Sequence, residues 1–334
     1  MSIAIHRRTA IAAGLAACVF AAPSAARNGR TEALRSGDRS ARIVVPFAAG
    51  GTTDLIARVV AGILSEATSW NFAVENRTGG SGNVSAEIVA RAVPDGRTLL
   101  LGHVGTAVTN QYLYRYVPYD CAESFAPIAL VGEVANVLVV HPSFRCRSLA
   151  ELIHCCKAQP PFHMSYGSPA IGSMGHLAME HLQGLAGIRL AHMPYRSRSR
   201  LIRDLRAGHV LVAMDNLPTC LPHIRSGAFH ALAVSSAGRW FAAPEIPSVS
   251  EHGFGDFNAT LWWYVAAPTG IRRALVNVLS EAIVKGLASE AAVARIRSLG
   301  VLETPRCADD LAAHIAAETV KWKTVIAAAG LEAR

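Results

Sequence analysis

The stretch that decides the fold is IVVPFAAGGTTD, residues 43–54. A short apolar run ends at Gly50-Gly51, and an amphipathic pattern follows at once, with apolar residues spaced by three and four from Leu55 to Leu64. This order predicts a buried strand, a tight turn and a helix over 52–66. The start of such a helix carries unpaired N–H groups and partial positive charge, so the turn favours an anion. Taken alone, the stretch fits an unliganded turn equally well.

Apolar runs typical of strands alternate with helix-like patterns through most of the chain. Strands are expected near 42–45, 72–74, 98–101, 128–131, 137–141, 163–166, 190–193, 210–214, 231–234 and 262–266. Further helices are expected near 82–92, 148–158, 173–185 and 198–206, and successive helices over 271–288, 290–299 and 306–328. This rhythm predicts an α/β protein with mainly parallel sheets flanked by helices.

The composition describes a globular chain of one large or two medium domains. Of its 334 residues, 51% are hydrophobic and 17% are charged, and the net charge is +8. Basic residues cluster at 196–206 without interleaved aromatic residues, so nucleic-acid binding is not expected. The modest positive field would attract small anions.

The amino terminus has the layout of a secretory signal peptide. Arg7 and Arg8 precede an apolar run over 10–22, and small residues at 24–26 offer a cleavage site. We therefore expect residues 1–26 to be removed and the mature protein, with a net charge of +6 after loss of the two arginines, to be periplasmic. Cys18 also fits a lipoprotein cleavage box, which leaves lipidation as an alternative.

The cysteines of the mature chain follow no metal-binding pattern. They are Cys121, Cys146, Cys155, Cys156, Cys220 and Cys307. The spacing predicts no metal site, and we expect mostly incidental thiols with one disulfide at most, whose pairing stays open.

Turns at the expected strand ends share one chemistry. The segments 47–54, 76–83, 102–106, 165–173, 194–197 and 214–216 are rich in glycine and in residues with hydroxyl or amide side chains. Ligands of open α/β sheets bind beyond the carboxyl ends of strands. Small neutral donors at these ends suit a carboxylate held by N–H and hydroxyl groups.

These motifs together resemble the extracytoplasmic receptors of tripartite tricarboxylate transporters, the Bug family, over residues 40–330. The segments that carry the likeness are 45–54, 74–77, 94–96, 166–177, 193–195, 215–227 and 231–234. The resemblance implies a two-lobed, type II-like periplasmic-binding-protein fold with two crossing strands between the lobes. Residues 27–136 and 259–334 would form lobe 1, and residues 137–258 would form lobe 2.

The resemblance also implies a carboxylate clamp in the cleft, built from two strand–helix loops. The candidate ligand-binding residues are Phe47, Ala49, Gly50, Gly51, Thr52, Asp54, Ser81, Gly105, Thr106, Ser168, Gly172, Ser173, Tyr195, Asp215 and Asn216. Asp54 would support the first loop. We expect Gly51 to take a backbone conformation barred to other residues and to let the ligand approach closely.

One departure from the family pattern borders the expected cleft. Where the family has a lysine and a glycine after the Pro-Tyr motif, this chain has Arg-Ser-Arg-Ser-Arg at 196–200. We expect this arginine-rich segment to tune ligand choice or docking rather than to grip the anchoring carboxylate. Arg196 would lie at the cleft mouth, and two interpretations stay open for it: part of a solvated basic face, or a contact to a second ligand carboxylate. Arg198, Arg200, Arg203 and Arg206 would point mostly to solvent.

The sequence therefore predicts a monomeric receptor, not an enzyme, that uses no cofactor. It would bind a small carboxylate (a di- or tricarboxylate, an amino acid or an aromatic acid) and deliver it to membrane transporter subunits. Two alternatives stay open: a secreted hydrolase of small esters or amides that uses Ser168 or Ser173, and a ligand sensor for a membrane kinase. The ligand itself is not determined by the sequence.

Overall fold

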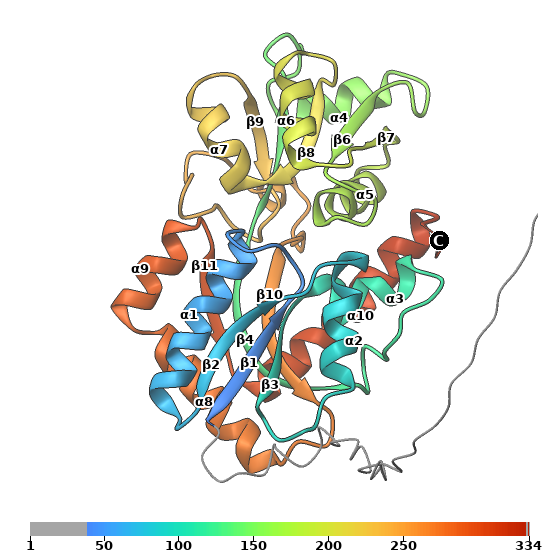
Figure 1. Cartoon of the computed structure of the whole chain (residues 1–334). Helices are drawn as coiled ribbons and strands as arrows, with labels where there is room; N and C mark the ends of the chain where they lie inside the picture. Colours follow the sequence, from blue (N-terminus) through green and yellow to red (C-terminus); the bar gives the residue numbers. More distant parts are fainter. Residues whose placement is uncertain (1–38, 332, 334) are drawn as a thin grey trace, which may run out of the picture. The chain divides into compact units, whose positions relative to one another are not determined.

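The computed structural model describes residues 39–331 and residue 333. The predicted signal peptide, with Cys18, lies outside these residues. The described chain contains two β-sheets, each covered by helices (Figure 1), and both belong to one compact unit that begins at Arg39. The predicted two-lobed α/β fold is confirmed. In the part of the chain that the structure describes, no helix combines the length and the apolarity needed to cross a bilayer.

The first sheet has the strand order β11-β4-β10-β3-β1-β2. Its strands are β1 (Ser40–Val45), β2 (Asn71–Asn76), β3 (Thr98–His103), β4 (Phe125–Val134), β10 (Leu261–Pro268) and β11 (Leu302–Arg306). β1 runs parallel to β2 and β3. β10 is antiparallel to β3 and β4, and β11 is antiparallel to β4.

The second sheet has the order β7-β6-β8-β5-β9. Its strands are β5 (Asn136–Val140), β6 (Ser165–Ser168), β7 (Ala191–Pro194), β8 (Val212–Asn216) and β9 (His230–Val234). β6 is parallel to β7 and β8, whereas β5 is antiparallel to β8 and β9. Both sheets are thus mixed, which corrects the expectation of mainly parallel sheets. β5 and β10 enter their sheets from the other sheet and not through a covering helix, so nothing forces them to be parallel.

Helices cover both sheets. They are α1 (Thr52–Ala67), α2 (Asn83–Ala90), α3 (Asn110–Leu113), α4 (Leu149–Lys157), α5 (Met174–Ala186), α6 (Arg198–Arg206), α7 (Leu217–Arg225), α8 (Arg273–Leu287), α9 (Glu290–Ser298) and α10 (Ala308–Ala328). Short turns of 3₁₀-helix occupy Gly80–Gly82 and Val249–His252, and a π-helical turn occupies Gly105–Thr109. The apolar stripe of α1 packs with α8 against the first sheet, where Ile56, Val60 and Leu64 are fully buried.

The chain crosses between the sheets twice. Ala135 alone separates β4 from β5, and the segment 235–260 leads back from β9 to β10. A buried hydrogen-bond cluster joins the two crossings: Asn136 N donates to Ser235 Oγ (2.8 Å), Ser235 N donates to Asn136 O (2.8 Å), and Asn136 Nδ2 donates to Ala259 O (3.1 Å). We call Asn136, Ser235 and Ala259 the crossing cluster. All three residues are fully buried, so the two crossings are tied to each other at one point.

Trp262 and Trp263 anchor the returning strand in the core. The Trp262 indole donates to Glu318 Oε2 on α10 (3.0 Å), and the Trp263 indole donates to Thr53 Oγ1 on α1 (3.0 Å). Each tryptophan is 1% exposed. Adjacent side chains of β10 thereby attach helices on opposite faces of the first sheet.

The first turn of α5 packs so closely on β8 that it requires a glycine. A Cβ atom at Gly175 would lie 2.3 Å from the backbone oxygen of Met214, whereas a Cβ at Gly184 on the same helix meets nothing within 4 Å. We expect Gly175→Ala to lower the free energy of unfolding by about 1–3 kcal/mol, because backbone must shift. Gly184→Ala is the matched control and gains up to about 1 kcal/mol of helix propensity. Urea unfolding followed by circular dichroism measures both, and equal stabilities would contradict the packing described.

Candidate ligand-binding site

A cavity of about 210 Å³ lies between the two sheets, at the ends of their strands. Residues from the first sheet and its helices line one side: Phe47, Ser81, His103, Val104, Gly105, Thr109, Asn110, Leu113, Tyr114 and Leu261. Residues attached to the second sheet line the other side: Pro169, Ala170, Ile171, Gly172, Ser173, Met174, Gly175, Arg198, Asp215 and Asn216.

The cavity collects part of the predicted site. The candidate residues that line it are Phe47, Ser81, Gly105, Gly172, Ser173, Asp215 and Asn216. The candidates that do not line it are Ala49, Gly50, Gly51, Thr52, Asp54, Thr106, Ser168 and Tyr195. In this second group Ala49, Gly50, Gly51 and Thr52 are exposed, whereas Asp54, Thr106, Ser168 and Tyr195 are buried.

The first loop reaches the cavity through Phe47, and Asp54 holds this loop in place. Gly50 N donates to Asp54 Oδ2 (2.9 Å), and Asn76 Nδ2 bridges Asp54 Oδ1 and Phe47 O (both 3.0 Å). Arg58 Nε also donates to Asp54 Oδ2 (2.9 Å). Burial alone would raise the pKa of Asp54, but these donors hold it below its usual range. Asp54 is therefore an ionised support for the loop, as the resemblance implies.

The special backbone conformation in this turn belongs to Gly50 and not to Gly51. Gly50 has φ +81°, whereas Gly51 is extended, with φ −77° and ψ 166°. Gly51 is the residue that caps α1, and a cap needs extended dihedrals. The expectation that Gly51 adopts a conformation barred to other residues is therefore wrong, and the left-handed residue is its neighbour.

The second loop contains a buried serine and an accessible one. Ser168 is fully buried; its hydroxyl contacts Ala170 O (3.1 Å) and His192 Nε2 (2.8 Å), which fixes the loop from below. Ser173 lines the cavity and caps α5, because its hydroxyl accepts from His176 N (3.3 Å). The cap bonds the N–H of His176 only. The N–H groups of Met174 and Gly175, which line the cavity, therefore stay available at the start of α5.

Two other candidates serve the protein interior. Thr106 is fully buried, and its hydroxyl closes the turn after β3 by accepting from His103 N (3.0 Å) and donating to His103 O (2.9 Å). Tyr195 packs in the core of the second sheet with Leu201 and Leu205. Both follow a strand end, as expected, but their side chains turn away from the cavity.

Neutral donors and acceptors line the part of the cavity formed by the first sheet. Asn110 Nδ2 donates to Ser81 O (3.1 Å) and to Asn83 Oδ1 (2.6 Å), and the hydroxyls of Ser81 and Tyr114 are 2.5 Å apart. Ser81 has φ +52°, a left-handed conformation that few residues other than glycine adopt. The Asn110 amide bonds the Ser81 carbonyl and so holds this strained residue at the cavity.

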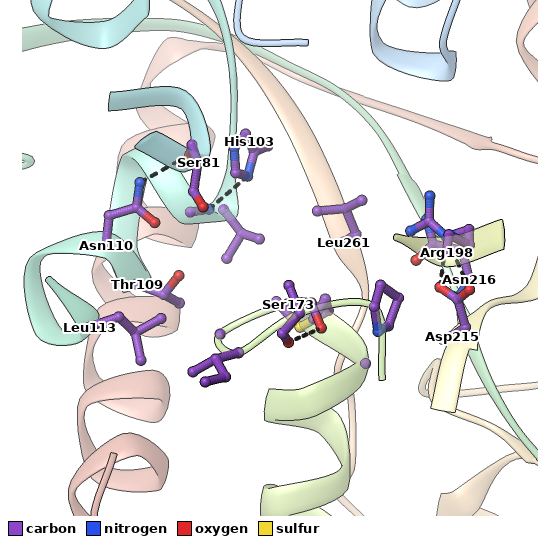
Figure 2. A pocket seen from close by; sticks show the side chains of 18 of the residues that line it. Ser81, His103, Thr109, Asn110, Leu113, Ser173, Arg198, Asp215, Asn216 and Leu261 are labelled. Carbon is purple, nitrogen blue, oxygen red and sulfur yellow. Dashed lines mark hydrogen bonds and ion pairs between the residues drawn. The ribbon is translucent and has the colours of Figure 1, made fainter. Parts of the chain in front are cut away.

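On the side of the second sheet, the cavity wall contains an ion pair that was not predicted from the sequence. Arg198 Nε donates to both carboxylate oxygens of Asp215, at 2.9 and 3.0 Å (Figure 2), and Asn216 N donates to Asp215 Oδ1 (2.7 Å). Arg198 was expected in solvent and Arg196 at the cleft; the structure places Arg198 in the cavity wall, and Arg196 is exposed and does not line it. The sequence feature that could have indicated this pair is Asp215 at a strand end, because a buried carboxylate needs a cationic partner.

Comparison with known proteins gives the chain a family. Residues 56–331 match the model of the tripartite tricarboxylate transporter family receptor. Protein BugT of Bordetella pertussis is 33% identical over 87% of this chain and 90% of its own length. Among solved structures, R. palustris Rpa4515 with adipate has a TM-score of 0.77 and 34% identity over 90% of this chain and 100% of that one. MatC from Rhodopseudomonas palustris with bound malate has a TM-score of 0.71 and 27% identity, over 86% of this chain and 99% of that one.

This chain is a member of the tripartite tricarboxylate transporter receptor family. The resemblance stated from the sequence motifs is confirmed. Members of this family are periplasmic solute receptors, which is not a class of enzyme.

In this receptor, His103 is a buried histidine at the end of β3, where it lies between Phe47 and the turn that follows the strand. Its ring lies 5.2 Å from that of Phe47, and its Nδ1 accepts from Gly105 N (3.0 Å). Burial lowers the pKa of His103 to about 4, with the Ser81 backbone opposing the shift. The imidazole is therefore neutral at pH 7, and it adds no positive charge to the cavity.

The lowered pKa of His103 predicts acid destabilisation. Below about pH 6.5 the unfolded chain binds a proton at this residue and the folded chain does not, so the free energy of unfolding falls until about pH 4. The loss reaches about 3 kcal/mol. His103→Asn keeps an acceptor for Gly105 N, and we expect it to flatten the pH dependence of stability over this interval. Denaturant unfolding across the pH series tests this. The exposed control His209→Gln retains the wild-type slope, and a wild-type slope in His103→Asn would show that His103 is not the group responsible.

Proposed function

We propose that this chain is an extracytoplasmic receptor that binds a small carboxylate in the cavity between its lobes and presents it to a tripartite transporter. The observation that carries the proposal is the cavity itself, in which the start of a long helix, neutral hydroxyl and amide groups and one arginine converge. The relatives whose titles name adipate and malate support the same class of ligand.

The start of α5 supplies the anchoring point for the anion. The helix spans 13 residues, and its first residues, Met174 and Gly175, line the cavity next to the Ser173 hydroxyl. Unpaired N–H groups and the helix dipole stabilise a carboxylate at this position.

Binding closes the lobes in this proposal. We assign residues 39–136 and 259–331 to lobe 1 and residues 137–258 to lobe 2, with the crossing cluster as the hinge. A ligand held by the Ser81–Tyr114 hydroxyl pair on one side and by the N–H groups at the start of α5 on the other favours the conformation in which both sides meet. The Trp240 indole, which donates to Gly300 O (3.2 Å) across the lobes, would add to the closed state.

The proposed receptor acts as a monomer, without a metal or a cofactor, after removal of residues 1–26 in the periplasm. It carries out no covalent chemistry. The hydrolase alternative is disfavoured because the Ser168 hydroxyl is fully buried and the Ser173 hydroxyl caps α5 while donating to Ala170 O (2.8 Å). The sensor alternative uses the same cavity, and it differs in the membrane protein that recognises the closed form.

The proposal predicts stabilisation by organic acids. A ligand that binds the folded state at one hundred times its Kd adds about 2.7 kcal/mol, so the melting temperature rises by several degrees. Differential scanning fluorimetry of the mature protein with succinate, glutarate, adipate, malate and the matching neutral diamides measures the effect. We expect a rise with one or more acids and none with the diamides. Stabilisation by the diamides alone, or by none of the compounds, would overturn the proposal.

A further inference from the structure

We propose that Arg198 reads a second ligand carboxylate, so that this cavity selects dicarboxylates over monocarboxylates of the same length. The inference rests on the function proposed above and names the substrate class of the same site. It follows from the geometry of the Arg198–Asp215 pair and from its place in the cavity.

The ion pair uses one edge of the guanidinium and leaves the other available. Arg198 bonds both oxygens of Asp215 through Nε alone, at 2.9 and 3.0 Å. Within the described residues its two terminal nitrogens have no hydrogen-bond acceptor, and the side chain is 44% exposed. The Nη1–Nη2 edge of a guanidinium is a planar fork that matches a carboxylate with two parallel hydrogen bonds.

Asp215 orients the arginine for this role. Its side chain is 1% exposed, and its Oδ1 accepts from Asn216 N (2.7 Å), so the carboxylate is fixed to the end of β8. Burial raises the pKa of Asp215, and Arg198 opposes this shift. Because the buried carboxylate depends on the arginine, Arg198 is held at the cavity wall before any ligand arrives.

Among the described residues that line the cavity, Arg198 alone carries a permanent positive charge. His103 is neutral at pH 7, as shown above. Figure 2 shows Arg198 and Asp215 at one end of the cavity and Ser81 and Asn110 at the other, with Ser173 between them. One ligand carboxylate thus takes the neutral donors near Ser173, and a second, separated by a short chain, reaches Arg198.

The neighbouring arginines do not offer this contact. Arg196 and Arg200 are exposed and do not line the cavity. Arg203 pairs with Asp204 (3.2 Å) on the outer face of α6 and is 70% exposed. Arg198 differs because it is the first residue of α6, directly after the Ser197 cap, which turns its side chain toward β8.

Calorimetry with matched ligands tests the inference. The probes are the dicarboxylates from succinate to pimelate and their monoamides, which keep the length and remove one charge. We expect the best dicarboxylate to bind the wild type at least about tenfold more tightly than its monoamide. The variant Arg198→Gln/Asp215→Asn removes both charges together, which avoids an unpaired buried carboxylate. We expect this double variant to lose the preference for the dicarboxylate, while it binds the monoamide nearly as tightly as the wild type does. Arg200→Gln is the control and keeps the preference.

Each result separates the inference from the proposed function. If no acid binds the wild type, the proposed function fails, and the inference fails with it. If acids bind but the wild type does not distinguish a dicarboxylate from its monoamide, the function stands and the inference is overturned. An equal loss of affinity for both ligands in the double variant also overturns the inference, because Arg198 would then act on the structure of the loop.

An independent observation points to a disulfide between Cys146 and Cys155. Their sulfur atoms lie 2.8 Å apart, closer than unbonded sulfurs normally approach, and Cys146 is 1% exposed in the segment between β5 and α4. The adjacent Cys156 points elsewhere, toward Met164 (Sγ–Sδ 3.8 Å). We infer that an external disulfide, from a thiol oxidoreductase or a small-molecule disulfide, accepts two electrons and two protons from the two thiols. It leaves as two thiols while the Cys146–Cys155 bond forms.

Intact mass spectrometry of the protein purified from the periplasm without reductant tests this second proposal. We expect a chain about 2 Da lighter than its reduced form and a tryptic peptide pair that links the two cysteines. Cys146→Ser abolishes the mass difference and lowers the melting temperature by several degrees, whereas Cys220→Ser, a buried control, leaves the mass difference in place. Alkylation of both Cys146 and Cys155 in the unreduced protein would overturn the proposal.

Discussion

The geometry of the whole cavity depends on the hydrogen bonds of Asn136. This residue lies where the chain first passes from one sheet to the other, and its backbone and amide bind Ser235 and Ala259 of the returning segment. It also stands opposite Asn216 in the pairing of β5 with β8, and Val134, two residues earlier, stands opposite Leu261. Asn216 and Leu261 both line the cavity. One buried asparagine therefore joins the two crossings directly beside cavity residues of both sheets.

Local periodicity determined much of what could be predicted. The strand, turn and helix around 43–66 follow from apolar spacing, and the structure has β1 and α1 there. α7 was missed because Pro218 and Pro222 argue against a helix; Pro218 lies in the first turn, where its missing N–H costs nothing, but Pro222 lies inside the helix. β11 was missed because it is a half-exposed edge strand with polar residues, and edge strands lack the apolar pattern of central ones.

The candidate site was harder to predict, because side-chain direction is a tertiary property. Every candidate was chosen at a strand end, yet Thr106 and Tyr195 turn into the interior whereas Ser81 and Ser173 turn into the cavity. Sequence pattern does not separate these cases. Arg198 was assigned to solvent from the helical spacing of its neighbours, and its pairing with Asp215, 17 residues later, depends on β8 lying beside β6. His103 was overlooked because a histidine at a strand end has no distinctive spacing.

The charges of the cavity explain how it can combine affinity with selectivity. Neutral donors at the start of α5 attract a carboxylate without a counter-ion, so they favour any small acid equally. Arg198 adds discrimination, because its guanidinium is already ordered by Asp215 and loses little side-chain entropy when a ligand arrives. The same pairing weakens the net field of the arginine, since Asp215 cancels its charge at a distance. A monocarboxylate therefore gains little from Arg198, and the gain appears when a second carboxylate lies directly against the free edge of the guanidinium.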